Sequence, residues 1–442
     1  MTALLQRQNF QTSRLLEYFS EKELTLQTGH EPGRWPDVVL KELIDNALDA
    51  CEEAGVLPEI RIDVDENQIT IEDNGPGIPA KVIKGVLDYA VRTSSKDCYI
   101  SPSRGAQGNA LKTVLAIPYV VSGCEHGRLT ITSRRQQHSI GVTVDKIAQQ
   151  PIISHAVSAD GLVKAGTQVR VWWPDSARSI LESAGPRFLQ MVSTYSLFNP
   201  HAAFIIRLGQ TPTEYPRSTQ ACPKWVTSQP TSPHWYTAEQ LRALACAYLN
   251  AERHGAPART VREFISEFRG LSGTAKQKAI LATLPVARVH LHDLVQNGDV
   301  DHQTMAALLA AMQQESRPVK PDALGVVGEP AMKAWLEQQP GGAKSVTYTK
   351  TAGVDDESGR PFVIETAFAV RVAEGRLRLV TGINWASTLV DPFRALDVYG
   401  LSLRGLLGEL HLADRHAVTF VVHLACPHLN YTDRGKSSLE GL

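Results

Sequence analysis

Asp73 stands in the stretch EDNGPGIP, directly after an alternating strand pattern and just before Gly75, Gly77 and a proline turn. A tight turn at the end of a β-hairpin would account for the glycines but not for the carboxylate. A carboxylate at this place can accept a hydrogen bond from an exocyclic amine, and Gly77 lets a flat ring approach the backbone. The stretch therefore predicts recognition of an amino-substituted ring.

Two further stretches carry polar or glycine signals. In TSSKDCYISPSRGAQGNALKTV, Gly105 and Gly108 lie in a polar loop immediately before a predicted helix, where backbone N–H groups suit phosphate oxygens. In AGTQVRV, Thr167 opens a strand and could hydrogen-bond a ligand. Neither stretch is specific when taken alone.

The stretch KELIDNALDA, residues 41–50, has helical spacing. Its apolar residues form a stripe, and its polar residues lie on the remaining side, so that Glu42 and Asn46 are one turn apart and point the same way. Taken alone, this is the solvated side of an amphipathic helix. Lys41 and Asp45 are predicted to be ordinary surface residues.

The elements around these residues mix both periods. Residues 36–55 predict a helix, with Pro36 at its start and Gly55 beyond its end, and residues 59–73 predict a strand, a tight turn and a second strand. Further strands are predicted at 128–135, 138–145, 167–174 and 202–209, and further helices at 79–90 and 177–198. Hairpins on one side and helices on the other predict a two-layer α/β sandwich.

The composition divides the chain into three parts, which is expected for 442 residues. Residues 1–225 contain the mixed pattern, and a Pro/Ser/Thr-rich stretch, CPKWVTSQPTSPHWYT, ends it. From Thr237 to about Gln314 the periods are helical, so residues 226–315 are predicted to form a small all-helical domain. Residues 316–442 return to long strands, with helix 402–412, and predict a second α/β domain. The fold class is therefore α+β.

Bulk properties limit the function classes. The net charge of −1 and the absence of a dense Lys/Arg run exclude a whole-chain electrostatic nucleic-acid binder. The six cysteines include no CxxC pair, and no stretch is long and apolar enough for a membrane span or a signal peptide, so we expect a soluble cytoplasmic protein. His423, Cys426 and His428 in HLACPH are weakly spaced for a metal site, and a packed strand end explains them better.

Taken in order, the motifs E-x-x-x-N-x-x-D-A, D-x-G-x-G, G-x-x-G and G-T resemble the Bergerat-type ATP-binding fold. This fold is shared by type II topoisomerases, Hsp90-type chaperones, mismatch-repair ATPases and histidine kinases. Within that superfamily the chain resembles the B subunit of DNA topoisomerase VI over nearly its whole length. ELIDNALDACEEAG and IEDNGPGIP match the first two boxes, and SRGAQG matches the lid. TSPHWYTAEQL resembles the entry to a helix-two-turns-helix domain, and VTGINWASTLVDP and VVHLACPHLNYTDRGKSSL resemble parts of a transducer domain.

The resemblance implies an ATPase that binds ATP with Mg²⁺, and it implies roles for single residues. Glu42 would be the general base for the attacking water, Asn46 would hold Mg²⁺, and Asp73 would bind the adenine amine. The terminal phosphates would be held by the lid residues Gly105, Gln107 and Gly108, with Lys96 at the lid's mouth. Asp49 would be the acidic neighbour of the first box, and Lys436 the switch lysine that reaches the γ-phosphate from the transducer domain.

The resemblance also implies partners: a homodimer formed on ATP binding, double-stranded DNA, and a separate DNA-cleaving A-type subunit. Two departures from the family pattern stand out. Ala110 replaces a glycine expected in the lid, and the chain ends at Leu442, shortly after Lys436, where the family continues with a long helix that contacts the A-type subunit. We therefore expect that contact helix to be missing, either because the form is shortened or because the contact is made differently. No cleavage chemistry is evident on this chain.

Two alternatives remain open. The first is another Bergerat-fold ATPase clamp, chaperone-like or mismatch-repair-like, although the helical insert at 226–315 fits the topoisomerase VI plan better. The second is a nucleotide-binding regulatory module without topoisomerase activity, although the retained Glu42 argues against lost turnover. A histidine kinase fits less well, because no phosphoacceptor helix hairpin precedes Glu42.

Overall fold

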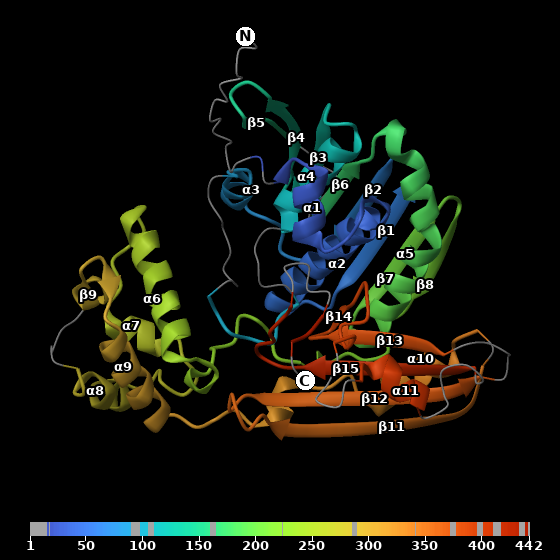
Figure 1. The fold of residues 1–442 in the computed structure, drawn as a ribbon. Coiled ribbons are helices and arrows are strands. Elements are labelled where there is room, and N and C mark those ends of the chain that lie inside the picture. Colours follow the sequence, from blue (N-terminus) through green and yellow to red (C-terminus); the bar gives the residue numbers. More distant parts are fainter. Residues whose placement is uncertain are drawn as a thin grey trace, which may run out of the picture.

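The structure is a computed structural model of the 442-residue chain. It describes residues 16, 18–89, 98–104, 110–159, 165–222, 224–284, 290–340, 342–371, 377–395, 401–409, 417–432 and 438–440. Figure 1 shows two sheets and a helical segment that projects to one side.

The N-terminal part is built on an eight-stranded sheet in the order β5-β4-β3-β6-β2-β1-β7-β8. The strands are β1 (Glu59–Asp65), β2 (Gln68–Asp73), β3 (Gly127–Ser133), β4 (Gln136–Asp145), β5 (Gln150–Ala159), β6 (Thr167–Trp172), β7 (Ala203–Leu208) and β8 (Thr211–Tyr215). All neighbours are antiparallel except β1 and β7, which pair in parallel. The pairing of β2 with β6 sets Asp73 directly opposite Thr167.

Helices cover one face of this sheet. They are α1 (Glu21–Thr28), α2 (Trp35–Glu53), α3 (Ala80–Val86), α4 (Ala110–Val121) and α5 (Arg178–Phe198), with 3-10 turns at Pro32–Arg34 and Asp175–Ala177. α2 packs against α4, α5 and β2, and its apolar stripe is buried in the core between helices and sheet. The predicted two-layer α/β arrangement is therefore present.

The sequence pattern did not predict β5 and β8, which are the two edge strands. The residues of β5 are mostly exposed or half-buried, and those of β8 are almost all exposed. An edge strand with little core contact needs no strict alternation of apolar and polar residues, so its sequence carries a weak signal.

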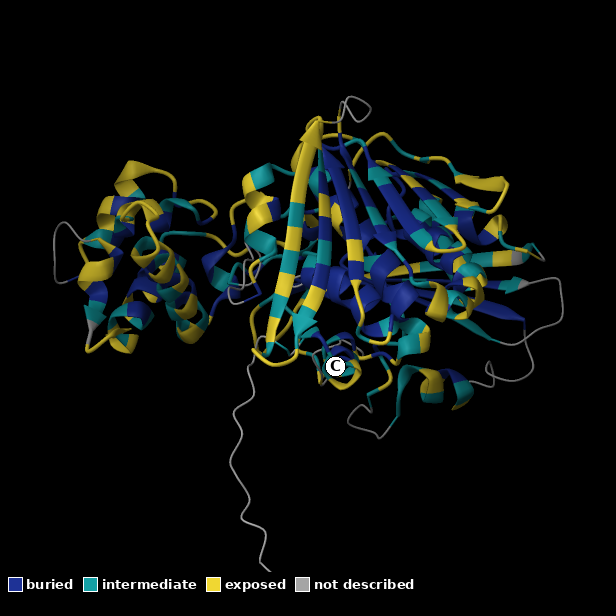
Figure 2. Cartoon of the chain, turned by 90° about the horizontal axis from the view of Figure 1, so that it is seen from above, coloured by how far each residue is buried: buried dark blue, intermediate teal, exposed yellow. Residues whose placement is uncertain are grey.

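The middle of the chain is helical, with α6 (Ala238–Arg253), α7 (Val261–Ser266), α8 (Thr274–Leu281) and α9 (His302–Gln314). Short elements complete it: 3-10 turns at Pro233–Trp235 and Leu291–Leu294, and strands β9 (Val295–Gln296) and β10 (Asp299–Val300). Its two ends meet, because Lys224 forms a β-bridge with Gly325 and Trp225 N–H donates to the carbonyl of Leu324 at 2.9 Å. Figure 2 shows this helical insert standing to one side of the two sheets, with exposed outer surfaces.

The C-terminal part has a five-stranded sheet in the order β11-β12-β15-β13-β14. Its elements are α10 (Glu329–Glu337), β11 (Ala343–Val354), β12 (Pro361–Arg371), β13 (Arg378–Ile383), β14 (Ala386–Ser387), α11 (Leu403–Glu409) and β15 (Val418–Ala425), after a 3-10 turn at Pro321–Leu324. β13 and β15 are parallel, and the other described pairs are antiparallel. The sequence predicted β12, β13, α11 and β15 but not α10 or β11.

In the part of the chain that the structure describes, no helix is both long enough and apolar enough to cross a bilayer. The six cysteines are free thiols.

Candidate functional site

Helix α2 presents Glu42 and Asn46 on one face. Glu42 is half-buried and Asn46 is exposed. Pro36 lies in the first turn of α2, where its missing N–H costs nothing, and the buried apolar stripe fixes which side of the helix faces the core. The two residues predicted to act together are therefore one turn apart on a side that a ligand can reach.

Asp45 corrects one sequence prediction, because it is buried, with an exposed fraction of only 4%. Lys41 Nζ donates to Asp45 Oδ2 at 2.6 Å, and the hydroxyl of Tyr195 donates to Asp45 Oδ1 at 2.6 Å. Helical spacing could not reveal this, since the covering hydroxyl comes from α5, which is 150 residues away in sequence.

Lys41 is also more than a surface residue. Burial alone would lower the pKa of Lys41, but the carboxylates of Asp45 and Glu42 outweigh burial and raise that pKa above its usual value. A positive charge therefore lies within electrostatic range of Glu42.

Asp73 forms the second part of the site. It is 8% exposed, and its Oδ1 accepts hydrogen bonds from the N–H of Gly75 at 2.8 Å and the N–H of Thr167 at 3.3 Å. Burial raises the pKa of Asp73 to about 6, although the two N–H donors work in the opposite direction. Within the described ranges Oδ2 has no hydrogen-bond partner, so one carboxylate oxygen remains for a ligand.

Two glycines let the loops of this site touch. Gly166 has φ +83°, and a Cβ on it would overlap the carbonyl oxygen of Asp73. Gly77 has φ +78°, and a Cβ on it would lie 2.7 Å from Ser133 Oγ and 3.1 Å from the carbonyl oxygen of Gly166. The D-x-G-x-G turn and the G-T turn are therefore in direct backbone contact, which only glycine permits.

Ser133 is a site residue that the sequence did not reveal. It ends β3, opposite Thr167, and its Oγ accepts from the N–H of Ile78 at 2.8 Å and donates to the carbonyl of Gly166 at 3.3 Å. One hydroxyl thus holds both glycine turns. In the sequence, Ser133 is only the polar last residue of TITS, at the end of a strand with regular alternation. A serine at a strand end is too common to identify a role.

Asn74 fixes the Asp73 turn to the layer of helices. Its Nδ2 donates to the carbonyl of Leu57 at 3.0 Å, and its Oδ1 accepts from the N–H of Glu59 at 2.9 Å and from Cys51 Sγ at 3.3 Å. Cys51 is in the last turns of α2, so the same helix that carries Glu42 positions the Asp73 turn.

The predicted lid residues Lys96, Gly105, Gln107 and Gly108 lie outside the described residues. The segment before the lid is described, and it assigns a contact to Asp49: its Oδ1 accepts from Arg104 Nη1 at 2.7 Å.

Lys436 also lies outside the described residues, but both ends of its segment are described. Tyr431 and Leu439 form an antiparallel bridge, and Thr432 N–H donates to the carbonyl of Ser438 at 3.0 Å. Burial raises the pKa of Tyr431 to about 12, and the charge of Lys41 works against that increase. The base of the segment that carries Lys436 therefore lies near Lys41, the residue next to Glu42.

Besides Asn46, the described residues include a cluster of possible metal ligands around Glu52. Glu52, His201 and Cys222 come within 4.8 Å of one another, but the ammonium of Lys224 and the guanidinium of Arg104 already bind Glu52. Two bound cations exclude a third at that carboxylate.

The HLACPH segment behaves as a packed strand end. His423 Nδ1 lies 3.0 Å from Glu365 Oε2, and its Nε2 accepts from the N–H of Trp385 at 3.2 Å. Cys426 Sγ donates to the carbonyl of His428. Both imidazole nitrogens of His423 are therefore in use.

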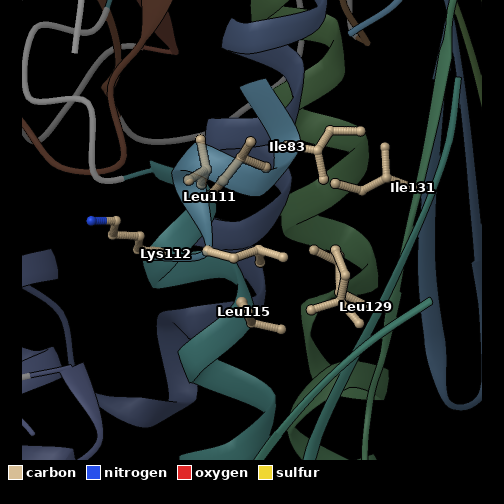
Figure 3. A pocket seen from close by; sticks show the side chains of 9 residues that line it. Ile83, Leu111, Lys112, Leu115, Leu129 and Ile131 are labelled. Atoms are coloured by element: carbon tan, nitrogen blue, oxygen red, sulfur yellow. The ribbon is translucent and has the colours of Figure 1, made fainter. Parts of the chain in front are cut away.

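An apolar hollow lies between α3, α4 and the sheet (Figure 3). It is lined by Ile83, Val86, Leu87, Leu111, Lys112, Leu115, Leu129, Ile131 and Ile140. Lys112 contributes only its alkyl chain, since its ammonium points away and donates to the carbonyl of Asp88 at 2.7 Å. Ile131 is two residues before Ser133 on β3, so the hollow lies on the same face of the sheet as Ser133. It offers apolar contact and no phosphate ligands.

The sequence of this chain is similar to a known ATPase domain and to curated proteins. Residues 34–177, which contain Glu42, Asn46, Asp73 and Thr167, match the model of the histidine kinase-, DNA gyrase B- and HSP90-like ATPase domain. The chain is similar to the B subunit of type 2 DNA topoisomerase 6 from Archaeoglobus fulgidus, with 25% identity over 96% of this chain and 70% of that protein. The protein of the same name from Saccharolobus shibatae is 24% identical over 92% of this chain and 76% of that protein.

Among solved structures, the ATPase region of Saccharomyces cerevisiae topoisomerase II bound to ICRF-187 matches with a TM-score of 0.39 and 11% identity, over 92% of this chain and 77% of that chain. That likeness is too low to carry an argument. The domain match and the curated relatives confirm the ATPase fold and the family resemblance that the sequence predicted.

The close contact at Gly166 predicts that an alanine substitution lowers the free energy of unfolding more at position 166 than at position 209. Gly166→Ala adds a Cβ that overlaps the Asp73 backbone, so we expect it to cost at least about 3 kcal/mol in the free energy of unfolding. Gly209→Ala is the matched control, because Gly209 has a similar φ of +72° with nothing within 4 Å of its Cβ, and we expect about 1 kcal/mol. Urea unfolding measures both. Equal losses would contradict the close approach of the two turns.

The raised pKa of Asp73 predicts a pH-dependent stability. Because the folded-state pKa of about 6 exceeds the ordinary 3.8, this carboxyl contributes stability at low pH that is lost as the pH rises through 6. Asp73→Asn keeps the Oδ1 acceptor and removes the buried charge. We expect the variant to be more stable than the wild type by on the order of 2 kcal/mol at neutral pH, with the difference vanishing near pH 4.

Thermal melts across this pH range check the expectation, with the exposed Asp65→Asn as control. A constant difference between Asp73→Asn and the wild type at all pH values would show that Asp73 is not the titrating group. The same variant should also lose adenine nucleotide, because its amide would present a donor to the exocyclic amine in place of Oδ2.

Proposed function

We propose that this chain is the ATP-hydrolysing gate subunit of a type IIB topoisomerase. The premise is that the chain is a homologue of the B subunit of type 2 DNA topoisomerase 6 and has a histidine kinase-, DNA gyrase B- and HSP90-like ATPase domain. One observation carries the proposal. Glu42 and Asn46 share the reachable face of α2, and the same helix fixes the turn that holds Asp73.

Adenine binds at Asp73 in this proposal. The unpaired Oδ2 accepts a hydrogen bond from the exocyclic amine, and Oδ1 stays with the N–H groups of Gly75 and Thr167. Gly77 supports the pocket by letting the turn after Asp73 pack against Ser133 and the Gly166 loop, and Thr167 completes the edge of the pocket. Ionised Asp73 is the accepting form, so binding should weaken as the pH falls below about 6.

Glu42 acts as the general base in this proposal: it orients the attacking water and takes its proton. Its position within range of the Lys41 charge, on the side of α2 that is open to a ligand, supports this role. Asn46 fits a magnesium ion, since an exposed amide oxygen one turn from Glu42 is the kind of ligand that Mg²⁺ takes. When bound, Mg²⁺ offsets the charge of the phosphates.

The terminal phosphates are assigned to the lid and to the switch lysine. Gly105, Gln107 and Gly108 would supply backbone donors, with Lys96 at the lid's mouth. Lys436 would reach the γ-phosphate, and the proximity of Tyr431 to Lys41 supports this assignment because it brings the base of the Lys436 segment to α2.

The gate needs partners. We propose that ATP binding joins two copies of the chain, and that the dimer controls DNA passage together with a separate DNA-cleaving A-type subunit. We assign the helical insert, residues 226–315, and the transducer domain, residues 316–442, to transmission of the nucleotide state. Double-stranded DNA is the substrate of the assembly.

The base assignment predicts a separation of binding from turnover. Glu42→Gln removes the proton acceptor and keeps the shape, so we expect ATP hydrolysis to fall by at least about 100-fold while the affinity for ATP changes less than about threefold. Glu53→Gln, an exposed carboxylate on the same helix, is the control and should hydrolyse ATP normally. Phosphate release and fluorescent-nucleotide titration measure the two quantities. Normal turnover in Glu42→Gln would remove Glu42 from the mechanism.

The gate proposal predicts a dimer that depends on nucleotide. Sedimentation velocity of the wild type should show a monomer without nucleotide and a dimer with a non-hydrolysable ATP analogue and Mg²⁺. Asp73→Asn, which should not bind the adenine ring, should stay monomeric under both conditions. A wild-type monomer at saturating nucleotide would favour the regulatory-module alternative, and DNA relaxation with a candidate A-type subunit would then separate a topoisomerase from another clamp.

A further inference from the structure

Residues 98–104, which we call the strap, immediately precede the predicted lid. We infer that the strap is a three-way anchor through which the helical insert and the C-terminal part set the position of α2, with Arg104 and Ile100 as positioning residues for ATP hydrolysis. This inference rests on the nucleotide site proposed above. It adds roles for Ile100 and Arg104 that the sequence analysis did not assign.

Arg104 ties the strap to α2. Its side chain is fully buried, and its guanidinium donates to Glu52 through both ends, Nη1 to Oε2 at 2.7 Å and Nη2 to Oε1 at 2.6 Å. Nη1 also donates to Asp49 Oδ1 at 2.7 Å. This two-pronged geometry needs the planar fork of arginine and cannot be copied by lysine. Asp49 lies one turn beyond Asn46, so Arg104 grips the helix that carries the proposed catalytic face.

The pKa of Glu52 reflects the positive charges that surround its buried carboxylate. Burial would raise the pKa of Glu52, but the charges of Arg104 and Lys224 lower it well below its usual value. Lys224 Nζ lies 2.5 Å from Glu52 Oε2, and Lys224 is the residue that pairs with Gly325 where the helical insert begins and ends. Removing Arg104 would leave the buried carboxylates of Asp49 and Glu52 with less positive charge to balance their negative charge.

The helical insert holds the strap at Ile100. Both backbone polar groups of Ile100 are used by the insert: its N–H donates to the hydroxyl of Tyr236 at 2.8 Å, and its carbonyl accepts from Thr231 Oγ1 at 2.6 Å. The neighbouring Tyr99 hydroxyl donates to Glu267 Oε2 at 2.9 Å, and Arg259 pairs with the same carboxylate. Side chains from the entry of the insert and from the end of α7 therefore fix two consecutive strap residues.

The C-terminal part holds the strap at its other end. Asn384 Nδ2 donates to the carbonyl of Ser103 at 3.5 Å. Asn199, which accepts from Arg104 Nη2, donates through Nδ2 to the carbonyl of Trp385 at 2.9 Å. Asn384 and Trp385 both have positive φ, 48° and 66°, so a tight turn after β13 directs these groups at the strap.

These contacts bond the strap to three different parts of the chain. Through Arg104 the strap is bonded to α2, and through Ile100 and Ser103 it is bonded to the helical insert and to the turn after β13. A shift of the insert or of the C-terminal part therefore acts on α2, the helix that carries Glu42. Misplacement of groups near the reacting atoms lowers the rate more than it lowers nucleotide affinity.

The test compares two conservative strap variants with two controls. Arg104→Lys keeps the charge and loses the fork, and Tyr236→Phe removes one hydroxyl from the Ile100 N–H. The controls are Arg242→Lys, an arginine of the insert bound to Glu239 and Asp299 away from the strap, and Tyr215→Phe on β8. Steady-state ATP hydrolysis gives kcat and KM, and titration with a fluorescent ATP analogue gives the dissociation constant.

We expect kcat to fall about tenfold in Arg104→Lys and about threefold in Tyr236→Phe, with dissociation constants within about twofold of wild type. Both controls should keep wild-type kcat. A merely structural role would lower the melting temperature without this split between kcat and affinity. If Arg104→Lys does not fold, the kcat and the dissociation constant of Tyr236→Phe test the inference.

Amide hydrogen exchange gives a second measurement. In the wild type, a non-hydrolysable ATP analogue should slow exchange in residues 231–267 of the insert, and this protection should be lost in Tyr236→Phe while the analogue stays bound. Wild-type kcat in both strap variants, with unchanged protection, would overturn the strap and leave the proposed ATPase intact. A wild type that neither binds nor hydrolyses ATP would overturn both.

Discussion

Helix α2 buries four carboxylates on its packed side, and each of them receives a cation or a hydroxyl group. Asp37 is held by Arg34 and Arg187, Asp45 by Lys41 and Tyr195, Asp49 by Arg104, and Glu52 by Arg104, Lys224 and His201. A buried carboxylate without such a partner would be strongly destabilising, so these contacts restrict how α2 can rotate or slide. Because Glu42 and Asn46 are on the same helix, the ion pairs on the packed side determine where the proposed catalytic face points. The apolar stripe buries the helix, and the ion pairs set its register.

Asp73 shows what happens when a buried carboxylate receives no cation. Its described hydrogen-bond partners are two backbone N–H groups, and burial raises its pKa to about 6. The same depth of burial thus has opposite results at two carboxylates: Glu52, with two cations, has a lowered pKa, and Asp73, with none, has a raised one. A carboxylate that is buried without a cation, at a cost in free energy, and that keeps one oxygen unpaired is typical of a binding site, where a ligand supplies the missing donor. This contrast distinguishes Asp73 from Glu52 without reference to any relative.

The sequence predicted the local features of the site and missed its long-range partners. Helix α2, the β1–β2 hairpin and the glycine turn after Asp73 have strong local periods and turn residues, and the order of the motifs was specific enough to predict the family, which the comparisons confirm. Asp45 was predicted wrongly because its partner Tyr195 is distant in sequence. Ser133 and Arg104 carry no local signal, since a serine at a strand end and an arginine in a polar loop are common. The roles of all the site residues remain predictions, and Lys96, Gly105, Gln107, Gly108 and Lys436 also lie outside the described residues.

The arrangement of the cores suggests where the molecule can move. One core lies between the N-terminal sheet and its helices, and a second is continuous from the helical insert into the C-terminal sheet, with Phe264, Met305, Val363 and Val421 all belonging to it. α5 joins the two, because its last residues, Leu197 and Phe198, enter the second core. There Phe198 stacks on His423 and lies so close to Gly382 that a Cβ would be 2.5 Å from its ring. The composition divides the chain into three parts, but packing joins the second and third. The strap is bonded to elements of both cores and lies across the boundary between them.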